Sequence, residues 1–386
     1  MPRGIAILGS TGSIGRNALR VIEALGPEYQ VVALSAHRNV ELLARQARQY
    51  KPRLVAVTDA DSASRFRALA GDLDVGILTG AASLSDLVQS DEVDTVLTAV
   101  VGAAGLPSAL AAARAGKRLA IANKEPLVMA GELLTQVAKE HGSTLLPVDS
   151  EHSAVFQAMR SGAAHEVQRI LLTGSGGPFR GATLEELQDV TLEQALDHPT
   201  WNMGPKITID SATMMNKALE VIEARWLFDV PVDRIEVLIH PESIVHSLVE
   251  FVDGSVVAQL GEPDMCLPIQ YALTYPDRVC GIAKRLRLEE IGELHFERPS
   301  PETFRALPLA YEVGRVGGTA AVVFNAANEA AVERFLAGEI RFLQIMELVE
   351  HCLSKHKVRH TTCLDELLEA DAWARREVKD KLFVRR

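Results

Sequence analysis

The chain has 386 residues, too many for a single hydrophobic core, so we expect two or three domains. Hydrophobic residues make up 47% of the chain and charged residues 24%, which is the composition of a soluble globular protein. The formal net charge of -11 argues against nucleic acid as a partner. The four cysteines form no C-x-x-C pair, which argues against a zinc site or a disulfide framework and favours a reducing compartment.

The amino terminus leads directly into a predicted strand, without a basic and then apolar leader. No later stretch is apolar for long enough to cross a bilayer. We therefore expect a cytoplasmic protein that has no membrane partner.

Short apolar runs alternate with helical segments as far as about residue 148. The predicted strands are 4–8, 31–35, 54–57, 75–78, 95–101 and 118–122. This alternation predicts an α/β fold with a doubly wound parallel sheet.

The first predicted strand ends in GSTGSIG, residues 9–15, and a helix is predicted to follow as far as residue 25. Glycines let the backbone turn sharply and approach a pyrophosphate, and the amides at a helix start face the anion. The spacing G-x-x-G-x-x-G differs from the standard G-x-G-x-x-G, so an ordinary loop is the alternative. The position between a strand and a helix favours dinucleotide binding.

The second predicted strand is followed by AHRN, residues 36–39, which lacks the acid that would hold the ribose 2′-hydroxyl of NAD. Arg38 can instead pair with a 2′-phosphate, which favours NADP. A solvated surface arginine is the alternative.

Polar residues also follow the next strands along the sheet. The proline of Asn123-Lys124-Glu125-Pro126 suits the first turn of a helix, so Lys124 is expected at a strand-to-helix turn. An apolar run at 145–148 stops at Asp149-Ser150-Glu151-His152. Alternate residues of an extended segment point the same way, so Asp149 and Glu151 could share one divalent cation. For an isolated D-x-E, two solvated acids before a helix are the commoner outcome.

Two loops with unusual composition come next. A strand at 167–172 runs into TGSGGP, residues 173–178, which could cradle a phosphate or form a flexible turn. The segment HPTWNMGPK, residues 198–206, carries Trp201 outside any periodic run and suits a mobile lid, although a tryptophan more often simply packs.

Residues 211–228 are predicted to form one helix with a polar arc. Asn216, Lys217 and Glu220 place an amide, a cation and a carboxylate within about one turn, which suits a phosphate and a metal. A solvated helix face is the alternative.

The rest of the chain is predicted to pass from strands to helices. Strands at 235–239, 247–252 and 255–260 include a hairpin turn at Asp253-Gly254, and exposed sheet surface there could pair two subunits. Amphipathic helices are predicted at 325–336 and 342–353. We therefore expect a nucleotide-binding domain at 1–149, an α+β catalytic and dimerisation domain at 150–274, a connector at 275–300 and a helical bundle at 301–386.

Nine motifs occur in the order found in the 1-deoxy-D-xylulose 5-phosphate reductoisomerase family, which the chain resembles over nearly its whole length. They are GSTGSIG, NKE, LLPVDSEH, TGSGGPF, HP-x-W-x-MG, DSATMMNK-x-LE, IHPESIVHS, GEPDM and NAANE. The resemblance implies a homodimeric oxidoreductase that uses NADPH and Mg²⁺ or Mn²⁺. It would convert the phosphorylated ketose 1-deoxy-D-xylulose 5-phosphate to 2-C-methyl-D-erythritol 4-phosphate, in the non-mevalonate isoprenoid pathway.

The same resemblance implies the roles of individual residues. Lys124 would act in catalysis beside three metal ligands, Asp149, Glu151 and Glu220. Substrate contacts would be Lys124, Ser150, Glu151, Ser175, His198, Ser211, Asn216, Lys217 and Glu220, with Trp201 and Met203 on the lid. Cofactor contacts would be Thr11, Gly12, Ser13, Ile14, His37, Arg38, Asn39, Asn123, Glu125 and Gly204.

Three residues depart from the family pattern. His37 stands where glycine is frequent, Pro126 replaces the serine of NKES, and Cys266 stands where a basic residue is common after GEPDM.

Three other functions compete with the reductoisomerase hypothesis. An NADP-dependent dehydrogenase of a phosphorylated aldehyde would need no three-carboxylate metal site. A metal-dependent phosphate-ester hydrolase would leave the glycine loop and Arg38 without a role. A non-catalytic nucleotide sensor would bind NADPH without turnover.

Overall fold

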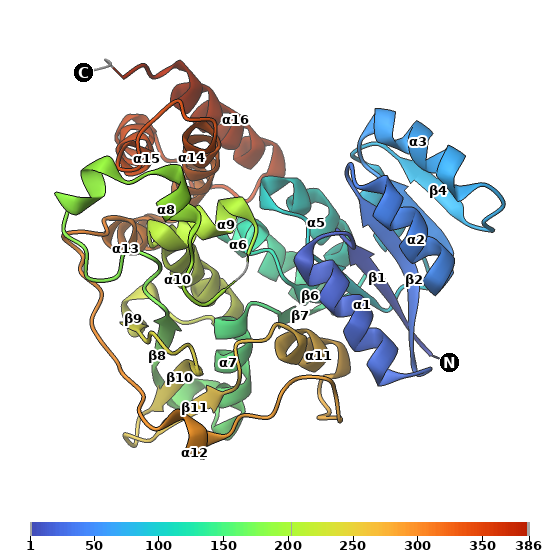
Figure 1. Cartoon of the computed structure of the whole chain (residues 1–386), viewed down its shortest axis with the longest axis horizontal. Coiled ribbons are helices and arrows are strands. Elements are labelled where there is room, and N and C mark those ends of the chain that lie inside the picture. Colours follow the sequence, from blue (N-terminus) through green and yellow to red (C-terminus); the bar gives the residue numbers. More distant parts are fainter. Residues whose placement is uncertain (1, 202, 384–386) are drawn as a thin grey trace. The chain divides into compact units, whose positions relative to one another are not determined.

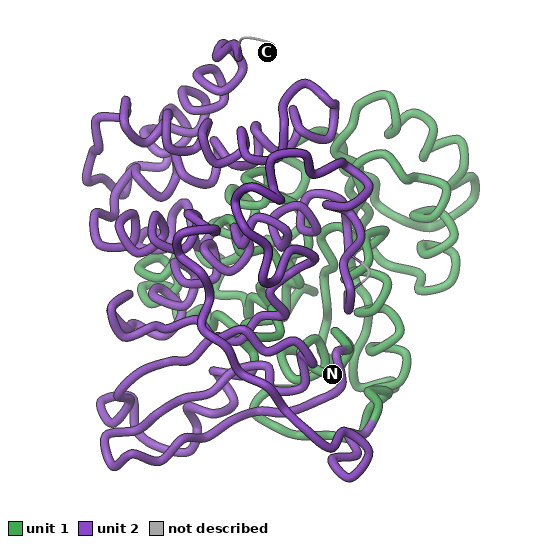
Figure 2. The backbone as a smooth tube through the Cα atoms, turned by 60° about the vertical axis from the view of Figure 1, so that its left-hand side comes forward, with its two compact units in different colours: residues 1–126, 134–153, 264–284 green, residues 127–133, 154–263, 285–386 purple. Residues whose placement is uncertain are grey.

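The computed structural model describes residues 2–201 and 203–383, which form two compact units (Figure 2). Unit 1 comprises Met1–Pro126, Leu134–Ser153 and Asp264–Lys284, and unit 2 comprises Leu127–Leu133, Ala154–Pro263 and Arg285–Arg386. The four-part division by function that we expected from the sequence remains a proposal.

Unit 1 contains a seven-stranded sheet in the order β4-β3-β2-β1-β5-β6-β7, and every neighbouring pair is parallel. The strands are β1 (Arg3–Leu8), β2 (Tyr29–Ala36), β3 (Leu54–Val57), β4 (Gly76–Thr79), β5 (Thr95–Thr98), β6 (Arg118–Ile121) and β7 (Thr144–Pro147). The order reverses direction between β1 and β5, so the predicted doubly wound parallel sheet is confirmed. In such sheets the carboxyl ends of the strands beside the reversal bind ligands.

Helices connect these strands and cover both faces of the sheet (Figure 1). They are α1 (Ser13–Leu25), α2 (Val40–Tyr50), α3 (Ala60–Ala70), α4 (Ser83–Val88), α5 (Leu106–Arg114) and α6 (Glu125–Glu140). Because both faces are covered, the central strands are apolar at nearly every position, and Ile5, Ala6, Ile7 and Leu8 are all fully buried. This explains the continuous apolar runs of the sequence.

The helix α11 (Cys266–Thr274) belongs to unit 1, although more than a hundred residues separate it from the rest of that unit. It packs on α1. Two hydrogen bonds hold the carboxyl end of α11. Arg3 donates to the carbonyl of Leu273 at 2.6 Å, and Arg118 donates to the carbonyl of Tyr275 at 2.6 Å. Nothing in the local sequence pattern of residues 264–274 indicated this long-range packing.

Unit 2 is built on a mixed sheet in the order β11-β10-β8-β9. Its strands are β8 (Val167–Gly174), β9 (Ile235–Ile239), β10 (Val245–Phe251) and β11 (Val256–Leu260). β10 runs antiparallel to β8 and to β11, whereas β8 and β9 are parallel. The predicted hairpin is present, and Asp253 caps its turn by accepting from the amide of Ser255 at 2.9 Å.

The predicted single helix at 211–228 is wrong in one respect, because it is interrupted at Met214. The chain forms α9 (Pro205–Ala212) and α10 (Met215–Phe228), and Met214 between them is left-handed with φ 60°. At the end of α9 the hydroxyl of Thr213 donates back to the carbonyl of Ile209 at 3.0 Å. Ser211 therefore lies at the end of one helix, and Asn216 lies in the first turn of the next.

The carboxyl-terminal region is helical, as predicted (Figure 1). It contains α13 (Ala306–Val316), α14 (Thr319–Leu336), α15 (Gln344–Lys355) and α16 (Leu364–Asp380). The central helix α14 packs against α13, α15 and α16.

The remaining α-helices of the described chain are α7 (Ser150–Ala158), α8 (Leu192–Leu196) and the short α12 (Leu288–Ile291). Among the described residues, no helix combines the length and the apolar character that a membrane span requires.

Candidate active site

The glycine loop after β1 has the close backbone contacts that only glycine permits. Gly9 has φ +85°, and a Cβ atom there would lie 2.5 Å from the carbonyl oxygen of Ala99. A Cβ atom on Gly15 would lie 2.5 Å from Ser10. Gly12 precedes α1, and no side chain caps that helix. The first amides of α1 are therefore available to an anion.

Buried hydrogen bonds hold this loop in place. The hydroxyl of Ser10 donates to Gln46 of α2 at 2.7 Å, and the Gln46 amide donates back to the Ser10 carbonyl at 2.9 Å. The amide of Gly9 donates to the hydroxyl of Ser35, at the end of β2, at 2.9 Å. Sequence reasoning missed Gln46, because a glutamine in an amphipathic helix gives no sign of such a partner.

The residues after β2 lie at the same carboxyl edge of the sheet as the glycine loop. Arg38 is exposed over 77% of its side chain and is 3.8 Å from Asp59, so its guanidinium is accessible to an anionic ligand. Asn39 caps α2 by accepting from the amide of Leu42 at 3.3 Å. The ring of His37 contacts the hydroxyl of Thr58 at 2.9 Å. The side chain of His37, at a position where the motif pattern often has glycine, is thus held by the residue that directly follows β3.

The neighbouring strands β6 and β7 bring Lys124 and Asp149 together as an ion pair. The two side chains are only 7% and 17% exposed, so this pair is largely withdrawn from water. Pro126 lies in the first turn of α6, as expected from its fixed backbone angle. Asn123 is buried and donates to the carbonyl of Gly102 at 3.4 Å.

Asp149 and Glu151 do not continue an extended strand, so the predicted strand-like alternation of these two side chains is wrong. β7 ends at Pro147, and Glu151 lies in the first turn of α7. The hydroxyl of Ser150 donates to the Glu151 carboxylate. Acids are favoured at a helix start because the helix dipole places partial positive charge there.

In unit 2, the side chain of His198 connects two serines that are distant in sequence. Its Nε2 atom lies 3.2 Å from the hydroxyl of Ser175 and 3.1 Å from that of Ser211. Its Nδ1 atom accepts from the amides of Thr200 and Trp201 at 3.1 and 3.0 Å. The proton of a neutral ring therefore lies on Nε2, where it can be donated to a serine oxygen. Burial lowers the pKa of His198, which favours this neutral form.

The glycines of TGSGG allow this loop to approach the helices behind it. Gly176 and Gly177 have φ +87° and +67°, and a Cβ atom on Gly177 would lie 2.6 Å from the carbonyl oxygen of Ser211. A Cβ atom on Gly174 would lie 2.7 Å from the Lys217 side chain. The loop thus packs directly against the end of α9 and the start of α10.

The polar arc of α10 is buried, so the solvated alternative is wrong for its central residues. Glu220 is fully buried, and Lys217 is only 5% exposed. The Lys217 ammonium lies 2.6 Å from one Glu220 oxygen and 2.5 Å from the carbonyl of Thr173. Asn216 donates to the other Glu220 oxygen at 2.6 Å. A buried carboxylate with a fixed orientation is suited to a hard cation.

The predicted lid segment is partly helical, since α9 begins at Pro205. Trp201 and Met203 are half-buried, and Gly204 is exposed immediately before the helix. Asn202 lies outside the described residues. The lid function of this segment remains a prediction.

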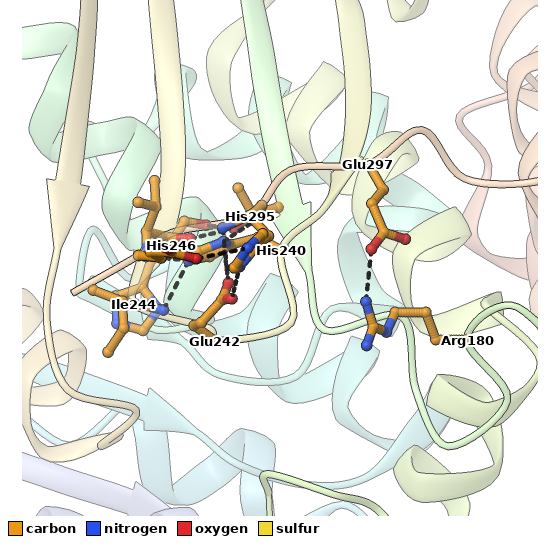
Figure 3. A network of polar contacts seen from close by, with 10 residues as sticks. Arg180, His240, Glu242, Ile244, His246, His295 and Glu297 are labelled. Carbon is orange, nitrogen blue, oxygen red and sulfur yellow. Dashed lines mark hydrogen bonds and ion pairs between the residues drawn. The ribbon is translucent and has the colours of Figure 1, made fainter. Parts of the chain in front are cut away.

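A polar network fixes the connector strand beside β9 (Figure 3). Ile239 and Glu297 exchange two backbone hydrogen bonds of 2.9 Å, and Arg180 pairs with Glu297 at 2.7 Å. The fully buried His240 donates from Nδ1 to the carbonyl of His295 at 2.8 Å, while Glu242 contacts the His295 ring at 2.6 Å. The amide of His240 donates to the carbonyl of Gly174 at 2.7 Å, so this network adjoins the TGSGG loop.

Cys266, the third departure from the family pattern, is the first residue of α11 and is 1% exposed. Burial raises the pKa of its thiol to about 11. It is therefore a protonated core residue near neutral pH, and no ligand contact is indicated for it.

Family models match three consecutive parts of the chain. The model described as 1-deoxy-D-xylulose 5-phosphate reductoisomerase matches residues 5–131, and two models of the carboxyl-terminal domains of that enzyme match residues 145–228 and 260–377. The 1-deoxy-D-xylulose 5-phosphate reductoisomerase of Geobacillus sp. (strain WCH70) is 52% identical over 98% of this chain and 99% of its own length. The chain belongs to the 1-deoxy-D-xylulose 5-phosphate reductoisomerase family.

Other members of the reductoisomerase family are similar over the same extent. The enzyme of Symbiobacterium thermophilum is 53% identical over 99% of both chains. A solved structure from Zymomonas mobilis in complex with NADPH has a TM-score of 0.91 and 42% identity, with 98% of each chain covered. A DOX-P reductoisomerase in complex with NADPH, fosmidomycin and magnesium has a TM-score of 0.93 and 41% identity, again with 98% covered. The resemblance stated from the motifs is thereby confirmed.

Proposed function

We infer that the chain converts 1-deoxy-D-xylulose 5-phosphate to 2-C-methyl-D-erythritol 4-phosphate, with NADPH as reductant and Mg²⁺ or Mn²⁺ as metal. Family membership over nearly the whole chain carries this conclusion. The similar solved structures bind NADPH and magnesium, the two cofactors expected from the sequence. The enzyme is thus an oxidoreductase that first rearranges the carbon skeleton and then reduces it.

NADPH is proposed to bind at the carboxyl ends of β1 and β2. The uncapped start of α1 suits the pyrophosphate, and the exposed Arg38 suits the 2′-phosphate. The proposed cofactor contacts are Thr11, Gly12, Ser13, Ile14, His37, Arg38, Asn39, Asn123, Glu125 and Gly204. The residues at the two strand ends belong to unit 1, and Gly204 belongs to unit 2.

Asp149, Glu151 and Glu220 are proposed to hold the divalent metal. All three offer carboxylate oxygens, which are the ligands that Mg²⁺ and Mn²⁺ prefer. The buried carboxylate of Glu220, with both oxygens oriented by Asn216 and Lys217, fits this role. When bound, the metal would polarise the substrate ketone and a neighbouring hydroxyl.

The substrate phosphate is proposed to bind between the TGSGG loop and the α9–α10 turn. Ser175, Ser211, Asn216 and Lys217 offer donors there, and neutral His198 orients the two serine hydroxyls. Binding energy from this phosphate would orient the distant reacting carbons. Lys217 supplies the positive charge that a dianion requires.

At the reacting end of the substrate, Lys124 and Ser150 are proposed to contact its oxygen atoms. Three carboxylates around one divalent ion leave about -1 charge, and Lys124, already paired with Asp149, offsets it. Trp201 and Met203 are proposed to cover the rearranged aldehyde until hydride transfer and to exclude water.

We further propose that the enzyme is a cytoplasmic homodimer. The sheet of unit 2 supports this assembly, because its edge strand β11 carries Val256 at 50% exposure and the adjacent turn carries Val252 at 64%. Four free cysteines suit a reducing compartment.

One assay tests the proposed reaction. Addition of 1-deoxy-D-xylulose 5-phosphate should cause a metal-dependent loss of NADPH absorbance, and mass spectrometry and NMR should identify the branched product. An unbranched alcohol would indicate a simple dehydrogenase, and release of inorganic phosphate would indicate a hydrolase. NADPH binding without any turnover would indicate a sensor.

A further inference from the structure

An acidic side chain is buried at the end of α9. Asp210 is 1% exposed and lies immediately before Ser211, in the last turn of that helix. The carboxyl end of a helix carries partial negative charge, which disfavours an acid there. Burial of a charge adds a further cost unless the charge is paired. Burying the Asp210 carboxylate at this place therefore costs folding free energy unless specific partners compensate its charge.

Two partners hold the Asp210 carboxylate. The Lys206 ammonium lies 2.8 Å from one oxygen and comes from the preceding turn of α9. The Asn328 side-chain amide donates to the other oxygen at 2.8 Å. Asn328 is fully buried on α14, and 118 positions separate it from Asp210. A helix of the carboxyl-terminal bundle thus reaches α9 through one buried, charge-assisted hydrogen bond.

The surroundings of Ser211 leave little room for α9 to shift. The Ser211 hydroxyl is 3.1 Å from His198, and its carbonyl lies where any Cβ atom on Gly177 would clash, at 2.6 Å. α10, which carries Asn216 and Lys217, begins four residues after Ser211. A displacement of Asp210 would therefore move the end of α9 and the start of α10 together.

We propose that Asn328 is a positioning residue for the substrate phosphate, which it orders through Asp210 and Ser211 without touching the substrate. This inference rests on the phosphate site proposed above. It gives Asn328, the second asparagine of the NAANE motif, a role that the motif pattern alone does not indicate. The other members of that motif face elsewhere, since Glu329 accepts from Asn325 at 2.9 Å and from Arg375 at 2.6 Å.

The test compares two matched substitutions on α14. Asn328→Asp would place a carboxylate against Asp210, whereas Asn325→Asp would place one against Glu329 on the same helix. Both asparagines are fully buried, and both donate to a carboxylate. We expect Asn328→Asp to raise KM for 1-deoxy-D-xylulose 5-phosphate roughly tenfold, and to leave the NADPH Kd and kcat at saturating substrate within about twofold. Asn325→Asp should lower Tm and leave this KM unchanged.

A double variant tests the direct pairing. Asp210→Asn with Asn328→Asp exchanges the donor and the acceptor, so it should restore KM to within about threefold of the wild-type value. A general packing defect would not be repaired in this way. The proposal would be overturned if Asn328→Asp changed KM no more than Asn325→Asp does, or if the double variant were no better than Asn328→Asp alone.

A third variant separates this proposal from the phosphate site on which it rests. If the proposed phosphate site is correct, Ser211→Ala raises KM for 1-deoxy-D-xylulose 5-phosphate whether or not Asn328 has a positioning role. A raised KM in Ser211→Ala with an unchanged KM in Asn328→Asp would overturn the positioning role alone. An unchanged KM in both variants would overturn the site as well.

Discussion

At the scale of single residues, the environment decides which protonation state and which partner each group can use. His198 is neutral because burial lowers its pKa and because two backbone amides donate to its Nδ1 atom. Glu220 is fully buried, yet cationic and amide donors orient both of its oxygens. Arg38, in contrast, is largely exposed and can reorganise around a ligand. The proposed roles of Glu220 and Arg38 can therefore be tested by separate substitutions.

Replacing Glu220 with glutamine keeps the shape of the side chain and removes its charge. We expect turnover to fall by at least about a thousandfold at ordinary magnesium concentrations, because one metal ligand loses its charge. NADPH affinity, measured by fluorescence titration, should change little. Glu329→Gln is the control, since Glu329 is a largely buried acid on α14 that pairs with Arg375, and it should keep the wild-type magnesium requirement. Unchanged activity in Glu220→Gln would remove this residue from the metal site.

Replacing Arg38 with alanine should reduce the preference for NADPH over NADH by roughly tenfold to a hundredfold, because a charged hydrogen bond to the 2′-phosphate is lost. The readout is the ratio of kcat/KM for the two cofactors. Arg53→Ala is the control, since Arg53 is exposed over 70% of its side chain and precedes β3, at the amino ends of the strands. An unaltered cofactor ratio in Arg38→Ala would assign the selectivity to other residues.

At the scale of secondary-structure elements, the ends of helices and strands determine where the site residues lie. The break at Met214 divides the predicted helix, so Ser211 and Asn216 belong to different helices. The connector pairs with β9 through Ile239 and Glu297, and His295 forms contacts with Glu242 beside that pairing (Figure 3). A short segment without periodicity is therefore fixed here by a β-bridge and by side-chain contacts.

The contact of His295 with Glu242 predicts a pH dependence of the connector pairing. The hydrogen bond that the His295 ring donates to the Glu242 carboxylate raises the pKa of His295, and the neighbouring Glu293 and Glu297 act in the same direction. A raised folded-state pKa means that this stabilisation is complete below the ordinary pKa of about 6.5 and is lost as pH rises through the raised value. Hydrogen exchange at the Glu297 amide, corrected for the intrinsic rate, should become faster over that range.

The control for this prediction removes the partner of His295. Glu242→Gln should largely abolish the pH dependence of protection at Glu297, because a glutamine does not favour the charged imidazole. Glu289→Gln, at an exposed site on α12, should keep it. A pH dependence that survived in Glu242→Gln would exclude His295 as its source.

At the scale of the whole molecule, the proposed sites recruit residues from distant parts of the chain. Unit 1 combines three stretches of sequence, and α11 joins it through contacts of Arg3 and Arg118. Unit 2 combines its mixed sheet with the helical bundle, and Asn328 connects that bundle to α9. The edge strand β11 is the feature of unit 2 that favours assembly with a second copy.

Replacing Val256 with lysine tests the proposed dimer. A lysine on an edge strand opposes pairing with another chain, so the variant should shift towards a monomer in light scattering coupled to gel filtration. Val316→Lys is the control, because Val316 is 46% exposed at the end of α13 and should leave the dimer intact. A Val256→Lys protein that remained fully dimeric would place the interface elsewhere.

The sequence by itself determined the alternation of strands and helices, the glycine loop, the strand-to-helix turn at Lys124 and the family, because periodicity, backbone preference and motif order are local properties. Only the tertiary structure decided the tautomer of His198, the burial of Glu220 and the pairing of Asp210 with Asn328. The burial of Glu220 and the pairing of Asp210 with Asn328 depend on contacts between residues that are distant in the chain, which no local pattern specifies. The tautomer of His198 depends on how its own non-periodic loop folds, because the amides of Thr200 and Trp201 donate to its Nδ1 atom. The sequence likewise predicted one helix at 211–228, and only the structure showed the left-handed Met214 that separates α9 from α10.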